Sequence, residues 1–266
     1  MHSRSPLIAL YDIAGAIKRY PLVGMLGWQD VRARYRRSAL GPFWITLSMG
    51  VMIATIGLVF GQIFNTPMQE YLPFLTIGMV LWAFIASVVT EGSMGFIAAE
   101  SVIKQLPIPL FVHIMRLIWR NLLIFAHNIV IVPIVMLIVG KSIGWIALLA
   151  IPGMVLLVLN LSWIALLLAM LCARYRDIPQ IVASVLQVVF YLTPIMWVPK
   201  LLPARAAIYL LDSNPAFHLI EVVRAPLLGQ APTAANWLAA LALTGIGWLA
   251  AVIVFGRHKR RIAFWL

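Results

Sequence analysis

Six long apolar segments run along the chain, and short polar stretches separate them. Apart from Glu91, Arg116 and Arg120, these segments contain no charged residue. Crossing the hydrocarbon core of a bilayer takes about 20 predominantly apolar residues in a helix. The pattern predicts an all-α integral membrane protein that forms a single domain over residues 1–266. The expected transmembrane helices cover about residues 43–64, 71–98, 110–140, 142–173, 178–199 and 234–255.

Composition supports the membrane class. The chain is 63% hydrophobic and only 11% charged, whereas a soluble domain has roughly 25% charged residues. The net charge of +12 would fit a nucleic-acid-binding protein, but the charges lie between the apolar segments. A single cysteine, Cys172, excludes an internal disulfide. We expect no cleaved signal peptide, because the early apolar run is interrupted by Asp12.

The basic residues predict the orientation. An even number of spans puts both ends on one side, and positive charge is enriched in cytoplasmic loops. With both termini in the cytoplasm, sixteen of the 20 Lys and Arg residues lie inside. The remaining four would lie outside: Lys141, Lys200, Arg205 and Arg224. The charge distribution predicts a multi-pass membrane protein with both ends in the cytoplasm.

Two cytoplasmic segments are neither spans nor ordinary loops. Residues 7–37 are expected to form interface helices, since Met25, Trp28, Val31 and Tyr35 recur at helical spacing among polar residues. Residues 98–110 form an expected elbow, in which two prolines break the helix. Residues 256–266 form a basic cytoplasmic tail.

On the opposite side, residues 200–233 are too apolar for an exposed loop. Asn214 and Pro215 are typical of a helix N-cap followed by proline at the first helical position. We expect two short periplasmic re-entrant helices before the last span. Asp177 is similarly expected to cap the fifth span.

Enzymatic motifs are missing from the sequence. The eight acidic residues show no Asp-x-Asp pair, and His113 and His127 lack metal-ligand spacing. The run Gly140-Lys141-Ser142 lacks the earlier glycine of a phosphate-binding loop. We therefore expect a chain that is not an enzyme and binds neither metal nor cofactor.

Five motifs in order resemble one family. They are "RYRRSALGPFW", "IKQLPIPLF", "RYRDIPQIV", "YLTPIMW" and "NPAFHLIEVVRAPLLG". Together they are similar to the permease subunits of ABC-type polysaccharide exporters of the O-antigen and cell-surface glycan class. The resemblance covers nearly the whole chain, although each motif alone is loose.

The resemblance implies a homodimer that pairs with two copies of a separate ATPase subunit, which would hold ATP and Mg. It also implies transport of an undecaprenyl-pyrophosphate-linked polysaccharide from the cytoplasmic face. In such permeases the interface helix and the elbow contact the ATPase, which correspond here to residues 22–37 and 100–109. The coupling residues implied are Arg34, Arg36, Arg37, Glu100, Lys104 and Gln105.

Charges inside a membrane helix normally face protein or water. Folding the elbow near residue 104 brings Glu91 opposite Arg116, which predicts a structural Glu91–Arg116 pair. Alternatively, Arg116 or Arg120 draws in the lipid pyrophosphate, because guanidinium binds phosphate bidentately. A third possibility is that both arginines reach toward the interface.

Aromatic residues also have two interpretations. Trp82, Phe84, Phe190, Tyr191 and Trp197 fit an interfacial belt. Some could instead line the pore and stack on sugar rings. The family places the dimer pore between spans one and five, which favours Tyr191 and then Phe190, with Trp82 as a further candidate.

Three rival functions remain open. One is a membrane-embedded enzyme of glycan-lipid metabolism, against which the missing acidic clusters count. Another is an exporter permease for small drug-like molecules. The third is a capsule or teichoic-acid exporter, which sequence alone separates poorly from O-antigen export.

Overall fold

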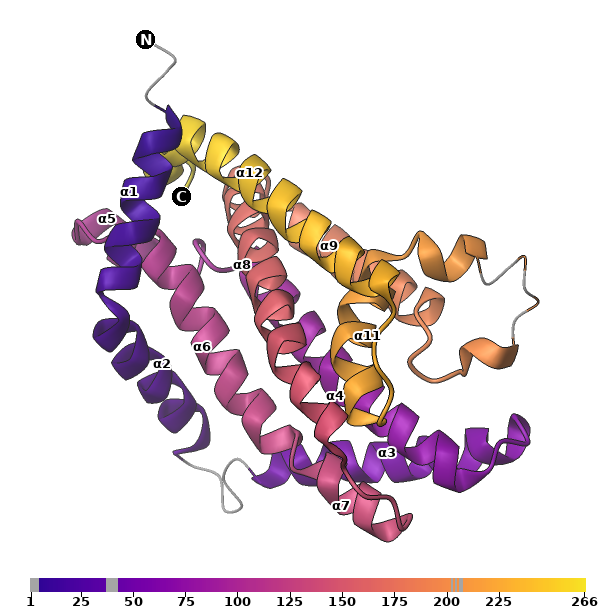
Figure 1. Ribbon diagram of the computed structural model, residues 1–266. Coiled ribbons are helices and arrows are strands. Elements are labelled where there is room, and N and C mark those ends of the chain that lie inside the picture. The colour runs from indigo at the N-terminus through magenta and orange to yellow at the C-terminus, as the bar shows by residue number, and fades with distance from the viewer. Residues whose placement is uncertain (1–4, 37–42, 202, 204, 206–207) are drawn as a thin grey trace.

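The computed structural model describes residues 5–36, 43–201, 203, 205 and 208–266, and every regular element in these ranges is helical (Figure 1). The elements are α1 (Ser5–Lys18), α2 (Tyr20–Tyr35), α3 (Phe43–Ile63), α4 (Met68–Ser93), α5 (Glu100–Gln105), α6 (Phe111–Asn128), α7 (Ile131–Ile138), η1 (Trp145–Leu149), α8 (Ala150–Arg174), α9 (Ile178–Leu192), η2 (Pro199–Leu201), η3 (Ile208–Asp212), α11 (Pro215–Leu227) and α12 (Ala234–Trp265). The all-helical expectation is confirmed in this part of the chain.

Five of the six expected spans have the length and hydropathy to cross a membrane. They are Phe43–Ile63, Met68–Ser93, Phe111–Ile138, Trp145–Arg174 and Ala234–Trp265. The remaining one, the fifth in chain order, was expected over residues 178–199. It is helical only over Ile178–Leu192, which is 15 residues. The last helix runs beyond residue 255 and includes the basic tail.

The end of α9 is held by side chains from residues 200–233, which we call the outer segment. Thr193 adopts an extended conformation, as expected for a residue that precedes proline. The Nδ2 of Asn214 donates to the Thr193 hydroxyl at 3.0 Å, and the Arg224 Nη1 donates to the Pro194 carbonyl at 2.5 Å. Pro194 thus marks a helix end rather than a kink, because these partners satisfy the backbone and side chain where α9 stops.

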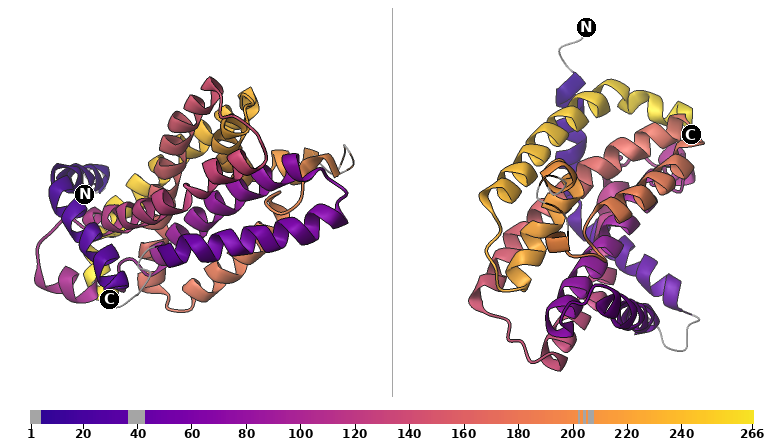
Figure 2. Two further views of the ribbon diagram at one scale, coloured as in Figure 1. Left: turned by 90° about the horizontal axis from the view of Figure 1, so that it is seen from below. Right: turned by 90° about the vertical axis from the view of Figure 1, so that its right-hand side faces the viewer.

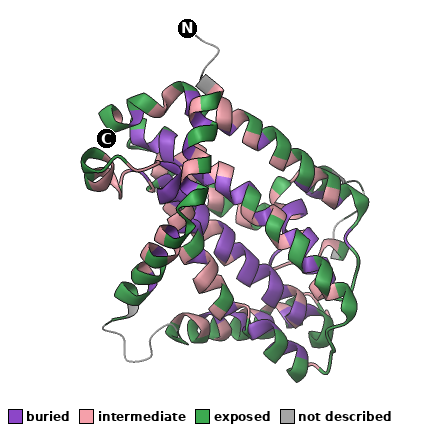
Figure 3. Cartoon of the chain, turned by 60° about the vertical axis from the view of Figure 1, so that its left-hand side comes forward, coloured by how far each residue is buried: buried purple, intermediate pink, exposed green. Residues whose placement is uncertain are grey.

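The core of the bundle is built on α4 and α8, where purple buried residues gather in Figure 3. A Cβ at Gly92 would lie 2.9 Å from the Ala165 Cβ, so small residues let α4 approach α8. Between α8 and α12, the Asn160 Nδ2 donates to the Thr244 hydroxyl at 2.7 Å. Asn160 therefore makes an interhelical hydrogen bond.

The interface helices pack on the bundle rather than standing away from it. α1 packs along α12, and α2 packs along α6. The start of α1 and the end of α12 lie at the same end of the bundle (Figure 1). On α2, Val23, Gly27 and Val31 are buried, whereas Met25 and Trp28 are exposed. The expected single stripe of Met25, Trp28 and Val31 was wrong, because residues four apart turn one face toward α6.

Two apolar helices have few neighbours inside this chain. None of the α9 residues is buried, and only 11% of the apolar window of α3 is buried. Both helices pack mainly on α4, and α3 lies at the margin of the bundle in both views of Figure 2. Their outward faces are therefore free in a single chain.

Among the described residues of the outer segment, the longest helix is α11, which packs on α8, α12 and α4. Asn214 caps it by accepting from the Ala216 and Phe217 amides at 3.0 and 3.3 Å, with Pro215 at the first position. This expected cap is confirmed. Asp177 also occupies the N-cap position of α9, as expected, but its side chain makes no capping hydrogen bond there.

Candidate functional site

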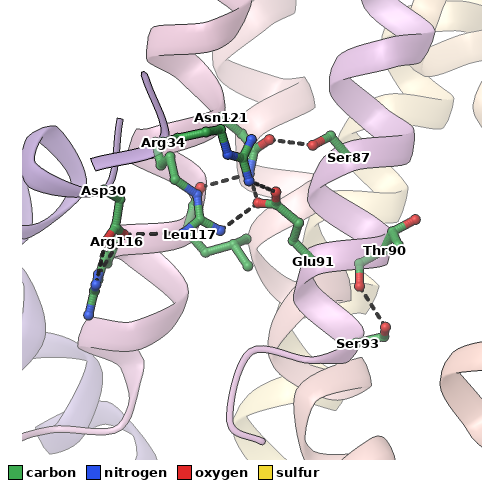
Figure 4. Close-up of polar contacts among 10 residues, drawn as sticks. Asp30, Arg34, Ser87, Thr90, Glu91, Ser93, Arg116, Leu117 and Asn121 are labelled. Atoms are coloured by element: carbon green, nitrogen blue, oxygen red, sulfur yellow. Dashed lines mark hydrogen bonds and ion pairs between the residues drawn. The ribbon is translucent and has the colours of Figure 1, made fainter. Parts of the chain in front are cut away.

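Charged side chains from three helices meet near the end of α4. We call this set the α2–α4–α6 cluster (Figure 4). Its members are Asp30 and Arg34 on α2, Glu91 on α4, and Arg116, Arg120 and Asn121 on α6. Members of the same helix are four residues apart where they share a face, as helical geometry requires. The cluster therefore joins an interface helix to two membrane-spanning helices.

Asp30 is the partner of both α6 arginines. Its carboxylate accepts from the Arg116 Nε at 2.7 Å and Nη2 at 2.5 Å, and from the Arg120 Nη1 at 3.2 Å. Burial of Asp30 raises its pKa, but the hydrogen bonds and charges of Arg116 and Arg120 outweigh burial and hold the pKa below 3.8. Asp30 is therefore ionised at neutral pH, and the paired contact with Arg116 is of the strong, directional kind.

Glu91 joins the other members. It accepts from the Arg120 Nη2 and the Asn121 Nδ2, both at 2.6 Å, and from the Arg34 Nη2 at 3.0 Å. The Ser87 hydroxyl donates in turn to the Asn121 Oδ1 at 2.5 Å. Glu91 thus has donors from α2 and α6 on one carboxylate, and a displacement of either helix must stretch or exchange one of these bonds.

The expected Glu91–Arg116 pair is wrong by one helical turn. In the structure Glu91 pairs with Arg120, and Arg116 pairs with Asp30. The α4–α6 hairpin does bring Glu91 to the correct face of α6. The expectation failed because α2 supplies a second carboxylate, Asp30, and its position depends on packing between elements far apart in the sequence.

A small cavity of about 120 Å³ adjoins the cluster. Its walls include Glu91, His113, Arg116 and Arg120. The His113 Nε2 and the Arg120 Nε are buried and have no hydrogen-bond partner in the described structure. Arg120 therefore lies beside a space that its guanidinium does not fill.

The elbow projects from the bundle beside this cluster. None of the α5 residues is buried, and the helix lies at the edge of the molecule (Figure 1). Lys104 pairs with Glu100 at 2.7 Å on its surface, and this hydrogen bond lowers the pKa of Glu100. Gln105 is exposed. Exposed polar residues on a short projecting helix form a surface that a partner protein can contact.

Asp12 anchors the far end of the elbow, and sequence reasoning missed it. Its carboxylate accepts from the Leu110 and Phe111 amides at 3.0 and 2.9 Å, and from the Lys259 Nζ at 2.7 Å. The first amides of a helix lack intrahelical partners and favour negative charge. Asp12 thereby ties α1 to the start of α6 and to α12. An acid inside an apolar run, with a basic tail elsewhere, was the only sequence signal.

The other predicted coupling residues are at the end of α2. Arg34 belongs to the cluster, and its side chain is 45% exposed. Arg36 is exposed at the end of α2. Arg37 lies outside the described residues.

The aromatic residues predicted to line the pore differ in their burial and contacts. Trp82 is buried on α4 and packs against Phe190 of α9, with ring centroids 5.6 Å apart. The ring centroids of Phe190 and Tyr191 are 5.4 Å apart, and Tyr191 is 59% exposed on the free face of α9. Trp82 therefore serves α4–α9 packing within the chain, whereas Tyr191 faces outward.

The described residues contain no group of three His, Cys, Asp or Glu side chains placed to hold a metal ion. The chemistry that the cluster offers is exchange of ion pairs between helices.

Residues 21–228, which include the cluster, the elbow and α11, match the ABC-2 type transporter family. The chain belongs to that family. The resemblance to ABC exporter permeases expected from the motifs is thus confirmed.

Relatives of this ABC-2 chain match over most of its length. The O-antigen export system permease protein RfbA of Klebsiella pneumoniae is 24% identical over 206 residues, 76% of this chain and 78% of that protein. A second RfbA of the same organism is 23% identical over 253 residues, 92% and 94% of the two chains. RfbA of Myxococcus xanthus is 23% identical over 235 residues, 87% and 90%. The likeness therefore extends from the interface helices to the last span.

Proposed function

We propose that this ABC-2 chain is the channel-forming permease subunit of an ATP-driven exporter that moves an undecaprenyl-pyrophosphate-linked polysaccharide of the O-antigen type out of the cytoplasm. The observation that carries the proposal is the match to O-antigen export permeases over up to 92% of the chain. A match of that extent includes the elbow, the cluster and the outer segment together.

The quaternary arrangement follows from the unpartnered helices. α3 and α9 present apolar faces that a single chain does not cover. We propose that two copies of the chain meet along α3 and α9 in the inner membrane, with both termini in the cytoplasm. Tyr191 then faces the glycan path, where an aromatic ring contacts sugars without strong directional bonds.

The coupling step follows from the elbow and the cluster. In the proposal, a separate ATPase that holds ATP and Mg contacts the projecting α5 and the end of α2. Movement of α5 reaches α1, α6 and α12 through Asp12, and movement of α2 reaches α4 and α6 through Asp30 and Arg34. Arg116 and Arg120 act as structural members of this junction, since both are already paired with carboxylates.

Deletion of the chromosomal gene tests the proposal. We expect lipid-linked glycan to accumulate on the cytoplasmic side while surface glycan disappears, with both restored by the wild-type chain. The chemical identity of the accumulated glycan separates O-antigen from capsule or teichoic acid. Affinity purification of the chain should recover an ATPase subunit. A deletion strain with normal surface glycan and no accumulated precursor would overturn the proposal.

A further inference from the structure

A second cavity lies away from the cluster and from α3 and α9. It is an apolar groove of about 670 Å³ between the interface helices and the spans α6, α8 and α12. Residues that line it include Ile17, Tyr20, Gly24, Met115, Trp119 and Trp248. A volume of this size lies within the range of about 300–1,000 Å³ that small-molecule sites occupy.

The side chains that line the groove offer mainly apolar contacts. Its serine, Ser162, already donates its hydroxyl to the Val158 carbonyl at 2.6 Å. Tyr20 and Trp119 stand at its edge with 70% and 40% of their surface exposed, where amphipathic rings favour the boundary between lipid tails and headgroups. The groove therefore suits a flexible hydrocarbon chain rather than a polar ligand.

Positive charge flanks the groove where α1 meets α2. Lys18 and Arg19 directly follow Ile17 and precede Tyr20, both of which line the groove, and both basic side chains are exposed. Neither forms an ion pair within the ranges that the structure describes. Cations near the membrane surface attract the phosphates of anionic lipids. Charge and apolar lining thus complement the two halves of a phospholipid.

We propose that the groove between α1, α2, α6, α8 and α12 binds an acyl chain of an anionic phospholipid, whose headgroup phosphate lies against Lys18 and Arg19. The lipid fills the space beneath the bend between α1 and α2, and so braces both interface helices against the bundle. The site is separate from the glycan path proposed along α3 and α9, which do not line it.

A pair of glycines provides a test of the apolar half. A Cβ at Gly24 meets no atom within 4 Å, and Gly24 lines the groove. Gly24→Trp should therefore extend an indole ring into the groove from an uncrowded backbone position. Gly245 is also open and exposed, but on α12 outside the groove, so Gly245→Trp is the matched control.

The readout is native mass spectrometry of the full chain, released from nanodiscs of equal phosphatidylglycerol and phosphatidylethanolamine. We expect wild type and Gly245→Trp to retain phosphatidylglycerol, and Gly24→Trp to lose it while its melting temperature stays at or above that of wild type. Equal retention by Gly24→Trp would overturn the proposal. So would a retained polyprenyl phosphate, found on protein purified directly from cells, in place of a phospholipid.

The headgroup half is tested by charge removal. Lys18→Gln with Arg19→Gln should reduce the retained ratio of phosphatidylglycerol to phosphatidylethanolamine by roughly five- to twentyfold, given two cations near the surface. Arg260→Gln with Arg261→Gln removes the same charge from exposed sites on α12 and should leave the ratio unchanged. The same ratio in both double variants would refute the headgroup assignment.

Discussion

Arginines stand near both ends of α4, and their burial and surroundings differ. Near its start, Arg224 of α11 is fully buried and pairs with Glu221 on its own helix. Its guanidinium also lies 4.0 Å from the centre of the Phe74 ring of α4. Near its end, Arg116 and Arg120 are 32% and 21% exposed and share carboxylates that belong to other helices.

This difference suits two mechanical roles. Arg224 has a partner on its own helix, an aromatic ring and the Pro194 carbonyl, so any movement would leave buried groups unpaired. In the α2–α4–α6 cluster, Arg120 already bonds both Asp30 and Glu91, and partial exposure lowers the cost of exchanging partners. We infer that α4 is held rigidly at the end near Arg224, which we call the lock, and can shift against α2 and α6 at the end near Glu91, which we call the joint.

The largest expected effect is loss of the lock. Arg224→Met removes the partner of Glu221, whose side chain is 15% exposed, and leaves the Pro194 carbonyl without its donor. Removing one member of a buried pair costs about 3–5 kcal/mol, so the purified variant should melt far below wild type. Arg205→Met, at an exposed position of the same segment, is the control. A melting temperature equal to that of wild type would contradict a lock.

Next in size is the anchor of the elbow. Asp12→Asn leaves the Lys259 ammonium unpaired and weakens the cap on α6, for a loss of about 2 kcal/mol. Hydrogen exchange should rise in α1 and at the start of α6 while α11 stays protected. Asp177→Asn removes an acid that makes no capping bond and should change nothing. Uniform exchange across the bundle would show that Asp12 is not a local anchor.

Double-mutant cycles resolve the pairing inside the joint. Coupling energies of about 1–3 kcal/mol are expected between Glu91 and Arg120 and between Asp30 and Arg116, because these side chains touch. Coupling between Glu91 and Arg116 should be at most about 0.5 kcal/mol. Glutamine and asparagine variants measured by thermal melting give the values. The pairing described here would be wrong if Glu91 coupled more strongly to Arg116 than to Arg120.

Strong acid should loosen the packing of α2 on α6, because the Asp30 carboxylate becomes protonated. The pKa of Asp30 is lowered from 3.8 in the folded state, so its stabilising contribution is complete above pH 3.8 and declines as the pH falls through the folded pKa. Protection factors in α2, which correct for the intrinsic pH dependence of amide exchange, should therefore stay constant from pH 7 to 5 and fall only in strong acid. Asp30→Asn should abolish that dependence in α2. A loss of protection near pH 6 would point to another group.

The smallest change in stability is expected on the exposed surface of α5. Lys104→Gln removes an i,i+4 pair worth about 0.3–0.5 kcal/mol, so the melting temperature should barely move. If α5 contacts the ATPase, recovery of that subunit in affinity purification should nevertheless fall several-fold. Lys141→Gln, exposed after α7, serves as control. Unchanged recovery would remove Lys104 from the contact.

Local features of this fold were readable in the sequence. Asn214 with Pro215 predicted the cap of α11, and the apolar runs predicted six spans, of which five have spanning length. The fifth run was overestimated because Pro194 stops α9 early, at a point where Arg224 and Asn214 satisfy the freed groups. Hydropathy alone does not reveal such partners.

The partners of the charged residues were harder to predict. Glu91 was correctly expected near the arginines of α6, but Asp30 and Asp12 were missed because both lie on interface helices. The stripe expected on α2 failed for the same reason, since Val31 faces α6 while Trp28 does not. Which face of an interface helix is covered depends on the helix that it meets.

By itself, the sequence determined the membrane class, the positions of the apolar helices and the family, because a bilayer of set thickness demands apolar runs of set length. Only the tertiary structure decided which carboxylate meets which arginine. An ion pair forms where two helices pack within a few ångströms, and a shift of one turn, about 5.4 Å, is enough to exchange the partner. Asp30, Glu91, Arg116 and Arg120 take their pairing from that packing.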